Sequence, residues 1–178
     1  MPTLDFKGKQ FVYAHHLTVP FRQMNVDAKK SLAKDGKVSV DDNLIIHGDN
    51  LHALKALLPR YSGQVGVAVI DPPYNTGEEG WCYNDKVNCG IMKEWLKDSA
   101  NPVDKDDLER HDKWLCMMWP RIQLLYELLS DGGFLAVCID DNELFNLGEI
   151  LNEIFGEKSC VAAIPWLSEP SGGNKNLL

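Results

Sequence analysis

Residues 71–77, with the sequence Asp-Pro-Pro-Tyr-Asn-Thr-Gly, hold the residue types in this chain that are best suited to chemistry. A residue that precedes proline has an extended backbone, and proline itself has no N–H to donate. The segment therefore offers acceptors, namely the Asp71 carboxylate and the carbonyl groups of Asp71 and Pro72, beside the aromatic ring of Tyr74. This combination predicts a site for a flat ring that carries an amino group.

The amine predicted for this segment is the exocyclic amine of a nucleobase. Such an amine is a poor nucleophile because its lone pair is delocalised into the ring, and two acceptors that bind both N–H protons favour a pyramidal nitrogen that can attack. Inside a duplex the base must first be flipped out, which costs about a few kcal/mol, and stacking on an aromatic ring contributes about 1–3 kcal/mol. We therefore predict that the catalytic residues are Asp71, Pro72, Pro73 and Tyr74. The alternative for Asp-Pro-Pro by itself is an ordinary turn.

A short apolar run places this segment at the end of a strand. Residues Val65–Ile70 are continuous and rich in valine, which is typical of a strand covered on both faces in a parallel sheet. In open α/β sheets, ligands bind outside the carboxyl ends of the strands, where Asp71 lies. The rest of the pattern predicts strands at 44–47, 134–139 and 160–166, and helices at 50–58, 106–129 and 140–155.

This order of elements predicts an α/β fold with an open, mainly parallel sheet, helices on both faces and right-handed crossovers. Pro120 is expected to kink or divide the helix over 106–129, and Asp131-Gly132-Gly133 to end it. One stripe on that helix is expected to pack in the core or against a subunit, and it consists of Trp114, Met117, Met118 and Trp119. Residues 1–42 are poorly periodic and are interpreted as an N-terminal arm.

Two further acidic positions follow predicted strands. Asp49 precedes a helix, so it is expected to cap that helix, to contact a cofactor, or both. Asp140, with Glu143 three residues later, is predicted to form a capping box rather than to act as a second catalytic acid. The long polar stretch from 78 to 105 carries aromatic residues that either stack on a displaced base or anchor the loop, namely Trp81, Tyr83 and Trp95.

The charge balance bears on the partners of the chain. Its 178 residues carry 18 basic and 26 acidic side chains, a formal net charge of −8. Because nucleic-acid-binding domains usually show a basic footprint, this balance argues against holding a polyanion by bulk electrostatics. No apolar run is long enough to span a bilayer, and the N-terminus lacks a secretory signal, so we expect a cytoplasmic protein. The five cysteines form no C-x-x-C pair, and neither disulfides nor a metal site are expected.

Several separated segments together resemble a known family. Residues 71–77 match the D-P-P-Y motif of S-adenosylmethionine-dependent amino methyltransferases that act on DNA. The Mod subunits of type III restriction-modification systems are the members most similar to this chain. Similarity to the adenine-N6 members of the β order extends over four more segments, residues 47–54, 83–85, 110–115 and 139–143.

The resemblance implies a Rossmann-like methyltransferase domain whose catalytic part occupies residues 43–178. It implies methyl transfer from S-adenosylmethionine to the N6 amine of a flipped-out adenine in double-stranded DNA, with Asp71 and Pro72 binding the amine. A restriction subunit and a second copy of the chain are the implied protein partners. For the cofactor we assign Asp49, Asn50 and Asp71. For the target base we assign Tyr74, Asn75, Thr76, Trp81 and Tyr83.

The chain departs from the family pattern because it contains no G-x-G sequence. The family's glycine-rich segment holds the methionine part of the cofactor, and in the β order it follows the target-recognition region. We therefore expect this chain to be an N-terminal fragment with an incomplete fold that is inactive alone. Two alternatives stay open. One is an RNA or protein amino methyltransferase, and the other is a non-enzymatic scaffold that dimerises or binds a restriction subunit.

Overall fold

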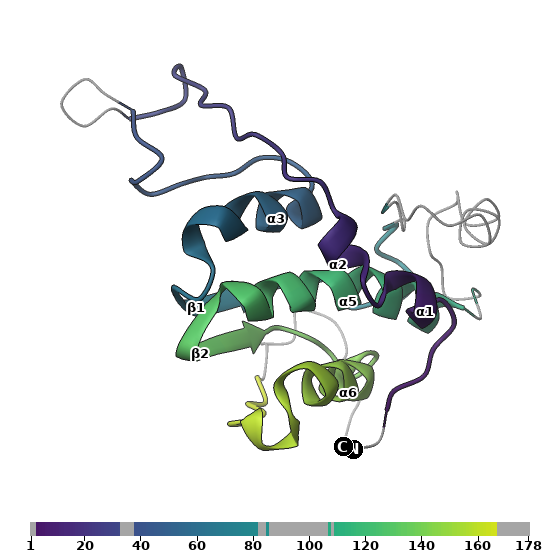
Figure 1. The fold of residues 1–178 in the computed structure, drawn as a ribbon. Helices are drawn as coiled ribbons and strands as arrows, with labels where there is room; N and C mark the ends of the chain where they lie inside the picture. Colours follow the sequence, from purple (N-terminus) through teal and green to yellow (C-terminus); the bar gives the residue numbers. More distant parts are fainter. Residues whose placement is uncertain (1–2, 33–37, 82–84, 86–106, 108, 167–178) are drawn as a thin grey trace, which may run out of the picture.

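A computed structural model describes residues 3–32, 38–81, 85, 107 and 109–166 of the chain. Five α-helices, one short 3₁₀ helix and two strands are found among these residues (Figure 1). In chain order they are α1 (Lys9–Val12), α2 (His15–Thr18), α3 (Asn50–Tyr61), β1 (Val65–Ile70), α5 (Arg110–Leu128), β2 (Leu129–Val137), α6 (Leu144–Phe155) and η1 (Glu157–Ser159).

Strands β1 and β2 form a parallel pair, which confirms the predicted α/β class. The register pairs Val67 with Phe134 and Ile70 with Val137. The pairing continues one step further, because the backbone N–H of Cys138 donates to the carbonyl of Ile70 at 2.9 Å. Asp71 therefore leaves the sheet directly at the carboxyl end of β1, as the sequence predicts.

Gly133 lies in an irregular part of β2, between the pairs Val65–Leu129 and Val67–Phe134. A Cβ atom at Gly133 would lie 2.9 Å from the carbonyl oxygen of Val65, which is closer than packed atoms allow. We expect Gly133→Ala to lower the free energy of unfolding by about 1–3 kcal/mol, as overpacking does. Chemical denaturation measures this effect. The control is Gly66→Ala, where a Cβ meets nothing within 4 Å, and equal losses in both variants would contradict the steric explanation.

Helix α5 is the centre of the molecule and lies between α3 and α6 (Figure 1). Its Trp114 and Trp119 side chains are almost fully buried, so the predicted aromatic and methionine stripe is core. One face of the sheet packs on the same cluster through Ile70, Leu135 and Val137. The fully or largely buried members of this cluster are Phe6, Val12, Trp114, Leu115, Cys116, Met118, Trp119, Ile122, Leu147 and Ile150.

Part of the predicted N-terminal arm packs into this core. Helices α1 and α2 contact α5, and Phe6 and Val12 are buried in the main cluster. Trp119 donates from Nε1 to the carbonyl of Tyr13 at 3.2 Å. A second cluster joins α3 to α5 through Leu51, Leu58, Leu124 and Leu128, with Val19 of the arm beside them.

The prediction of two further strands is wrong, because neither is formed in the structure. Residues 44–47 and 160–166 have no regular secondary structure, and Ile45 and Ile164 are exposed. An apolar run forms a strand only where a neighbour pairs with its backbone N–H and C=O groups. Among the described residues, the sheet contains only β1 and β2, and neither run pairs with them.

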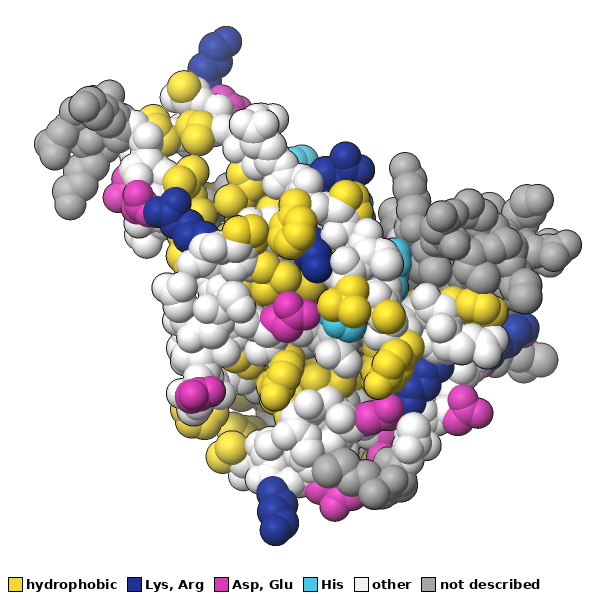
Figure 2. Space-filling view, in the orientation of Figure 1, with side chains coloured by type: hydrophobic (Ala, Val, Ile, Leu, Met, Phe, Trp, Pro, Cys, Tyr) yellow, Lys and Arg dark blue, Asp and Glu magenta, His cyan; other side chains and the backbone are white. Residues whose placement is uncertain are grey.

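The expected helical layers on both faces of the sheet are also not observed among the described residues. Val67, Val69 and Phe134 point away from the core, and between 56% and 69% of each is exposed. The prediction that β1 is covered on both faces is therefore wrong for this part of the chain. Hydrophobic side chains are also visible between the charged groups on the face shown in Figure 2.

Helix boundaries differ from the prediction in two places. Pro120 does not divide α5, because the helix is continuous from Arg110 to Leu128 and packing against its neighbours holds it across the missing N–H. Residues 131–133 do not end the helix either, since β2 begins at Leu129. Helix α6 stops as predicted before Gly156, whose φ of 92° favours glycine. Within the part of the chain that the structure describes, no helix is long and apolar enough to cross a membrane.

Candidate active site

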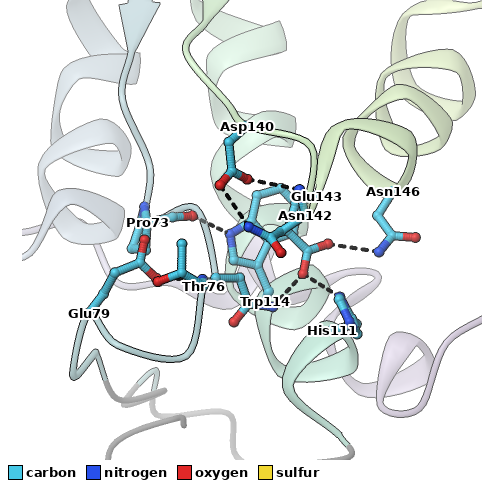
Figure 3. Close-up of polar contacts among 10 residues, drawn as sticks. Pro73, Thr76, Glu79, His111, Trp114, Asp140, Asn142, Glu143 and Asn146 are labelled. Carbon is cyan, nitrogen blue, oxygen red and sulfur yellow. Dashed lines mark hydrogen bonds and ion pairs between the residues drawn. The ribbon is translucent and has the colours of Figure 1, made fainter. Parts of the chain in front are cut away.

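The loop that follows β1 is attached to α5 by a buried indole. Trp114, which is 0% exposed, donates from Nε1 to the carbonyl oxygen of Pro73 at 2.7 Å (Figure 3). The Trp114 ring is held in the core, so the hydrogen bond fixes the position of the Pro73 carbonyl. This carbonyl is therefore occupied, and the acceptors left for a ligand are at Asp71 and Pro72.

A carboxylate within the same loop closes its turn. Glu79 accepts hydrogen bonds from the backbone N–H of Tyr74 at 2.6 Å and of Thr76 at 3.1 Å. The turn includes two residues with positive φ, Asn75 at 63° and Gly77 at 87°. Asparagine and glycine are the residues that adopt this conformation at least cost, which explains the Asn-Thr-Gly sequence after the tyrosine.

The Tyr74 side chain contacts the carboxylate of the same motif. Its hydroxyl donates to Asp71 Oδ1 at 2.9 Å, and this hydrogen bond, with smaller contributions from desolvation and nearby negative charge, raises the pKa of Tyr74. The phenol therefore stays protonated and remains a donor at neutral pH. Sequence reasoning did not predict this contact. In this arrangement an amine reaching Asp71 finds Oδ1 already engaged, and it must use Oδ2 or displace the hydroxyl.

The next loop residue is held from α6. Asn75 and Glu143 are both 0% exposed, and Asn75 Nδ2 donates to Glu143 Oε1. The same oxygen accepts from His111 Nδ1 at 2.6 Å, and Glu143 Oε2 accepts from Asn146 Nδ2 at 2.7 Å (Figure 3). Three side-chain donors thus compensate for the burial of one carboxylate.

This arrangement corrects the predicted capping box. Glu143 stands at the N-cap position of α6 but its side chain caps no backbone N–H. Asp140 instead accepts from the backbone and side-chain N–H groups of Asn142, at 2.9 and 2.7 Å. The Glu143 carboxylate instead accepts from the side chains of Asn75 and His111 across the fold and of Asn146 in the first turn of α6. No local spacing in the sequence signals this contact between residues 68 positions apart.

The predicted cofactor residues are held in place by helix ends. Asp49 caps α3, accepting at Oδ1 from Leu51 N at 2.8 Å and His52 N at 3.4 Å, which confirms its predicted capping role. Asn50 Oδ1 accepts from Arg121 Nε at 2.7 Å. Arg121 also binds the buried Asp85 with two nitrogens, at 2.5 and 2.8 Å. Arg121 therefore joins α5 to the start of α3 and to the polar stretch after the loop.

Comparison with known proteins identifies the family. A sequence model of DNA methylases matches residues 65–176, which include β1, the Asp-Pro-Pro-Tyr segment and α6. The chain belongs to the DNA methylase family. It is 32% identical over 185 residues to the type III restriction-modification enzyme EcoPI Mod subunit of Escherichia phage P1, and 30% identical over 186 residues to the EcoP15I Mod subunit of Escherichia coli. The predicted similarity to Mod subunits is thus confirmed.

The matches span only part of the length of these relatives. The matches cover 98% of the chain but 28% of each of the two Mod subunits. A type II methyltransferase of Klebsiella pneumoniae, M.KpnI, is 30% identical over 142 residues, which are 80% of the chain and 30% of that protein. The chain therefore spans less than a third of the length of these relatives.

The remaining residues predicted for the target base differ in their surroundings. Trp81 is half-buried against the main core cluster, and its Nε1 has no hydrogen-bond partner among the described residues. Asn75 faces Glu143, and its contact with a base stays a prediction. Tyr83 and Trp95 lie outside the described residues. Within the described ranges, no group of His, Cys, Asp and Glu side chains could hold a metal ion.

Proposed function

We propose that this DNA methylase transfers a methyl group from S-adenosylmethionine to the N6 amine of an adenine flipped out of double-stranded DNA, as part of a restriction-modification system. One observation carries the proposal. The Asp71 carboxylate accepts from the Tyr74 hydroxyl at the carboxyl end of β1, and Pro72 follows Asp71 on a loop that Trp114 of α5 and Glu143 at the start of α6 hold in place. Such a loop presents acceptors and a ring in a set geometry, which is what activation of a nucleobase amine requires.

The charge of the residues assigned to the cofactor is compatible with a sulfonium cation. Asp49 and Asp71 are exposed carboxylates, and two negative charges favour a cation that also carries hydroxyl and amino donors. S-adenosylmethionine supplies an electrophilic methyl group that needs no covalent enzyme intermediate. The residues that would hold it are Asp49, Asn50 and Asp71. In the described part of the chain, Cys116 is no nucleophile, because burial raises the pKa of its thiol.

In the proposed reaction the chain's own groups act on the base. The Asp71 carboxylate and the Pro72 carbonyl accept hydrogen bonds from the two N–H groups of the amine, so that its lone pair is available for attack on the methyl group. The Tyr74 ring stacks on the base and compensates for lost duplex stacking, about 1–3 kcal/mol. After transfer the extra proton of the amine leaves through Asp71, which is exposed to water.

The charge of the chain limits its share in DNA binding. With a net charge of −8, and with Lys and Arg side chains scattered over the face in Figure 2, the described residues show no basic patch on that face. We propose that this segment recognises the target base, and that groups outside the described residues bind the phosphates. The similar proteins named as Mod subunits support a restriction subunit as partner.

Methyl transfer by the full natural protein that contains these residues tests the proposal. DNA and S-adenosylmethionine with a labelled methyl group are incubated with it, and the nucleosides are separated by mass spectrometry. We expect N6-methyladenine. N4-methylcytosine would contradict the adenine assignment, and label found only in RNA or protein would contradict DNA as the substrate. A protein that transfers no label to any of these would contradict the enzymatic proposal as a whole.

A further inference from the structure

Glu143 is a carboxylate in an unusual place. Its side chain is 0% exposed at the start of α6, although a buried carboxylate costs stability unless it is well bonded. Its partners come from three parts of the chain, namely Asn75 of the loop after β1, His111 of α5 and Asn146 of α6. If Glu143 only stabilised α6, it would need neither the contact with Asn75 nor the contact with His111.

The contact with Asn75 connects Glu143 to the loop at the residue that follows Tyr74. Asn75 follows Tyr74 directly, has a positive φ of 63°, and is fully buried. Its Oδ1 has no hydrogen-bond partner among the described residues, so the bond from Nδ2 to Glu143 is its one recorded side-chain hydrogen bond there. The position of the Asn75 side chain therefore depends on Glu143.

Two anchors enclose the tyrosine. On one side Trp114 holds the Pro73 carbonyl at 2.7 Å, and on the other Glu143 holds the Asn75 amide. The carboxylate of Glu143 is itself oriented, because Asn146 binds its second oxygen at 2.7 Å. Fixing the residues before and after Tyr74 limits the directions in which its ring can point.

We infer that Glu143 is a positioning residue for the reaction, and that it sets the Tyr74 ring and the adjoining acceptors through Asn75. This inference rests on the proposed function, because its effect on rate requires that the loop bind the target base. Because the Glu143 side chain is 0% exposed, we assign it an effect on the reaction through the loop and not through contact with the base or the cofactor. Its effect is transmitted by the loop backbone.

The experiment compares Glu143→Leu with Glu143→Gln in the full natural protein. Misplacing a reacting group by about 1 Å can lower a rate by about 10²-fold, so Glu143→Leu is expected to lower kcat by up to that factor with a smaller change in KM for S-adenosylmethionine. Glu143→Gln is expected to keep most of kcat, because its amide oxygen still accepts from Asn75 and Asn146 can turn its oxygen to the new N–H.

Glu153→Leu is the matched control on the same helix. Glu153 is also a bonded carboxylate, which accepts from Lys9 Nζ at 2.8 Å and from Leu4 N at 3.2 Å, but it does not contact the loop. We expect this variant to lower the melting temperature and to leave kcat unchanged at a temperature where it is folded. Equal losses of kcat in Glu143→Leu and Glu153→Leu would reduce Glu143 to a structural residue and overturn the inference.

A second variant covers the case in which Glu143→Leu does not fold. Asn75→Gly keeps a residue suited to positive φ and leaves Glu143 bonded to His111 and Asn146, so it removes the side-chain connection between Glu143 and the loop. Because Asn75 is itself assigned to the target base, the double variant separates that contact from the connection to Glu143. We expect its kcat to fall as in Glu143→Leu, and the double variant to lose no more than either single one. Unchanged kcat in Asn75→Gly, or additive losses in the double variant, would overturn the inference.

Hydrogen exchange gives a readout that does not depend on activity. The backbone N–H groups of Tyr74 and Thr76 are bonded to Glu79, and they should exchange faster in Glu143→Leu than in Glu153→Leu. If the unmodified protein transfers no methyl group, the proposed function fails, and exchange still shows whether Glu143 holds the loop. Unchanged exchange at both N–H groups in Glu143→Leu would overturn the inference by itself.

Discussion

Asp71→Ala is expected to lower kcat for methyl transfer to DNA by at least about 10²–10³-fold, the loss seen when one preorganised hydrogen-bonding group is removed from an active site. The Asp71 carboxylate is the charged acceptor of the Asp-Pro-Pro-Tyr segment, and without it the target amine keeps its lone pair in the ring. The measurement is the initial rate with labelled S-adenosylmethionine at saturating DNA.

The fold of this variant is expected to be intact. Asp71 is exposed, and its one side-chain hydrogen bond recorded among the described residues comes from the Tyr74 hydroxyl. Circular dichroism and the melting temperature should therefore match those of the unmodified protein. Asp131→Ala is a suitable control, because it removes an exposed carboxylate from the same sheet far from its carboxyl end. Near-normal kcat in a folded Asp71→Ala protein would remove Asp71 from the mechanism.

Tyr74→Ala is expected to weaken binding of DNA with a flipped target base by about 5- to 150-fold, which corresponds to the 1–3 kcal/mol that base stacking contributes. The probe is DNA in which 2-aminopurine replaces the methylated adenine, because its fluorescence rises when the base leaves the stack. The unmodified protein should raise the fluorescence, and Tyr74→Ala should raise it less.

Tyr74→Phe separates the ring from the hydroxyl. The phenylalanine ring still stacks, but the hydrogen bond to Asp71 Oδ1 is lost, so binding of the probe should stay close to normal. Tyr126→Ala is the control, since Tyr126 is an exposed aromatic residue on α5 that packs on Phe155 instead of the loop. Equal losses in Tyr74→Ala and Tyr74→Phe would show that the hydroxyl, and not stacking, is what the base requires.

The hydrogen bond between Tyr74 and Asp71 also predicts that the Tyr74 hydroxyl and the target amine compete for Asp71 Oδ1. An amine that binds Asp71 Oδ1 must displace the hydroxyl, while Tyr74→Phe leaves that oxygen free. The raised pKa of Tyr74 keeps the phenol protonated, so this competition should not change with pH near neutrality. The tyrosine can thus shield the carboxylate until a base takes its place.

Local sequence patterns were sufficient to predict much of the structure that surrounds the candidate site. The valine-rich run placed Asp71 at a strand end, and the structure confirms β1 over Val65–Ile70. Helical spacing located α3, α5 and α6, and the aromatic stripe of α5 is core. Asp49 caps α3 as its position before a helix predicts. Each of these features depends on residues within one or two turns of each other, which spacing records directly.

The tertiary structure alone decided how the loop is held. Trp114 and Pro73 are 41 residues apart, Asn75 and Glu143 are 68 apart, and Arg121 and Asp85 are 36 apart, so no periodicity links them. For the same reason the apolar runs at 44–47 and 160–166 were predicted wrongly, since a strand needs a paired neighbour and a local pattern cannot supply it. The sequence determined the strand end and the residue types of the candidate site, and long-range packing decided which residues hold that site in place.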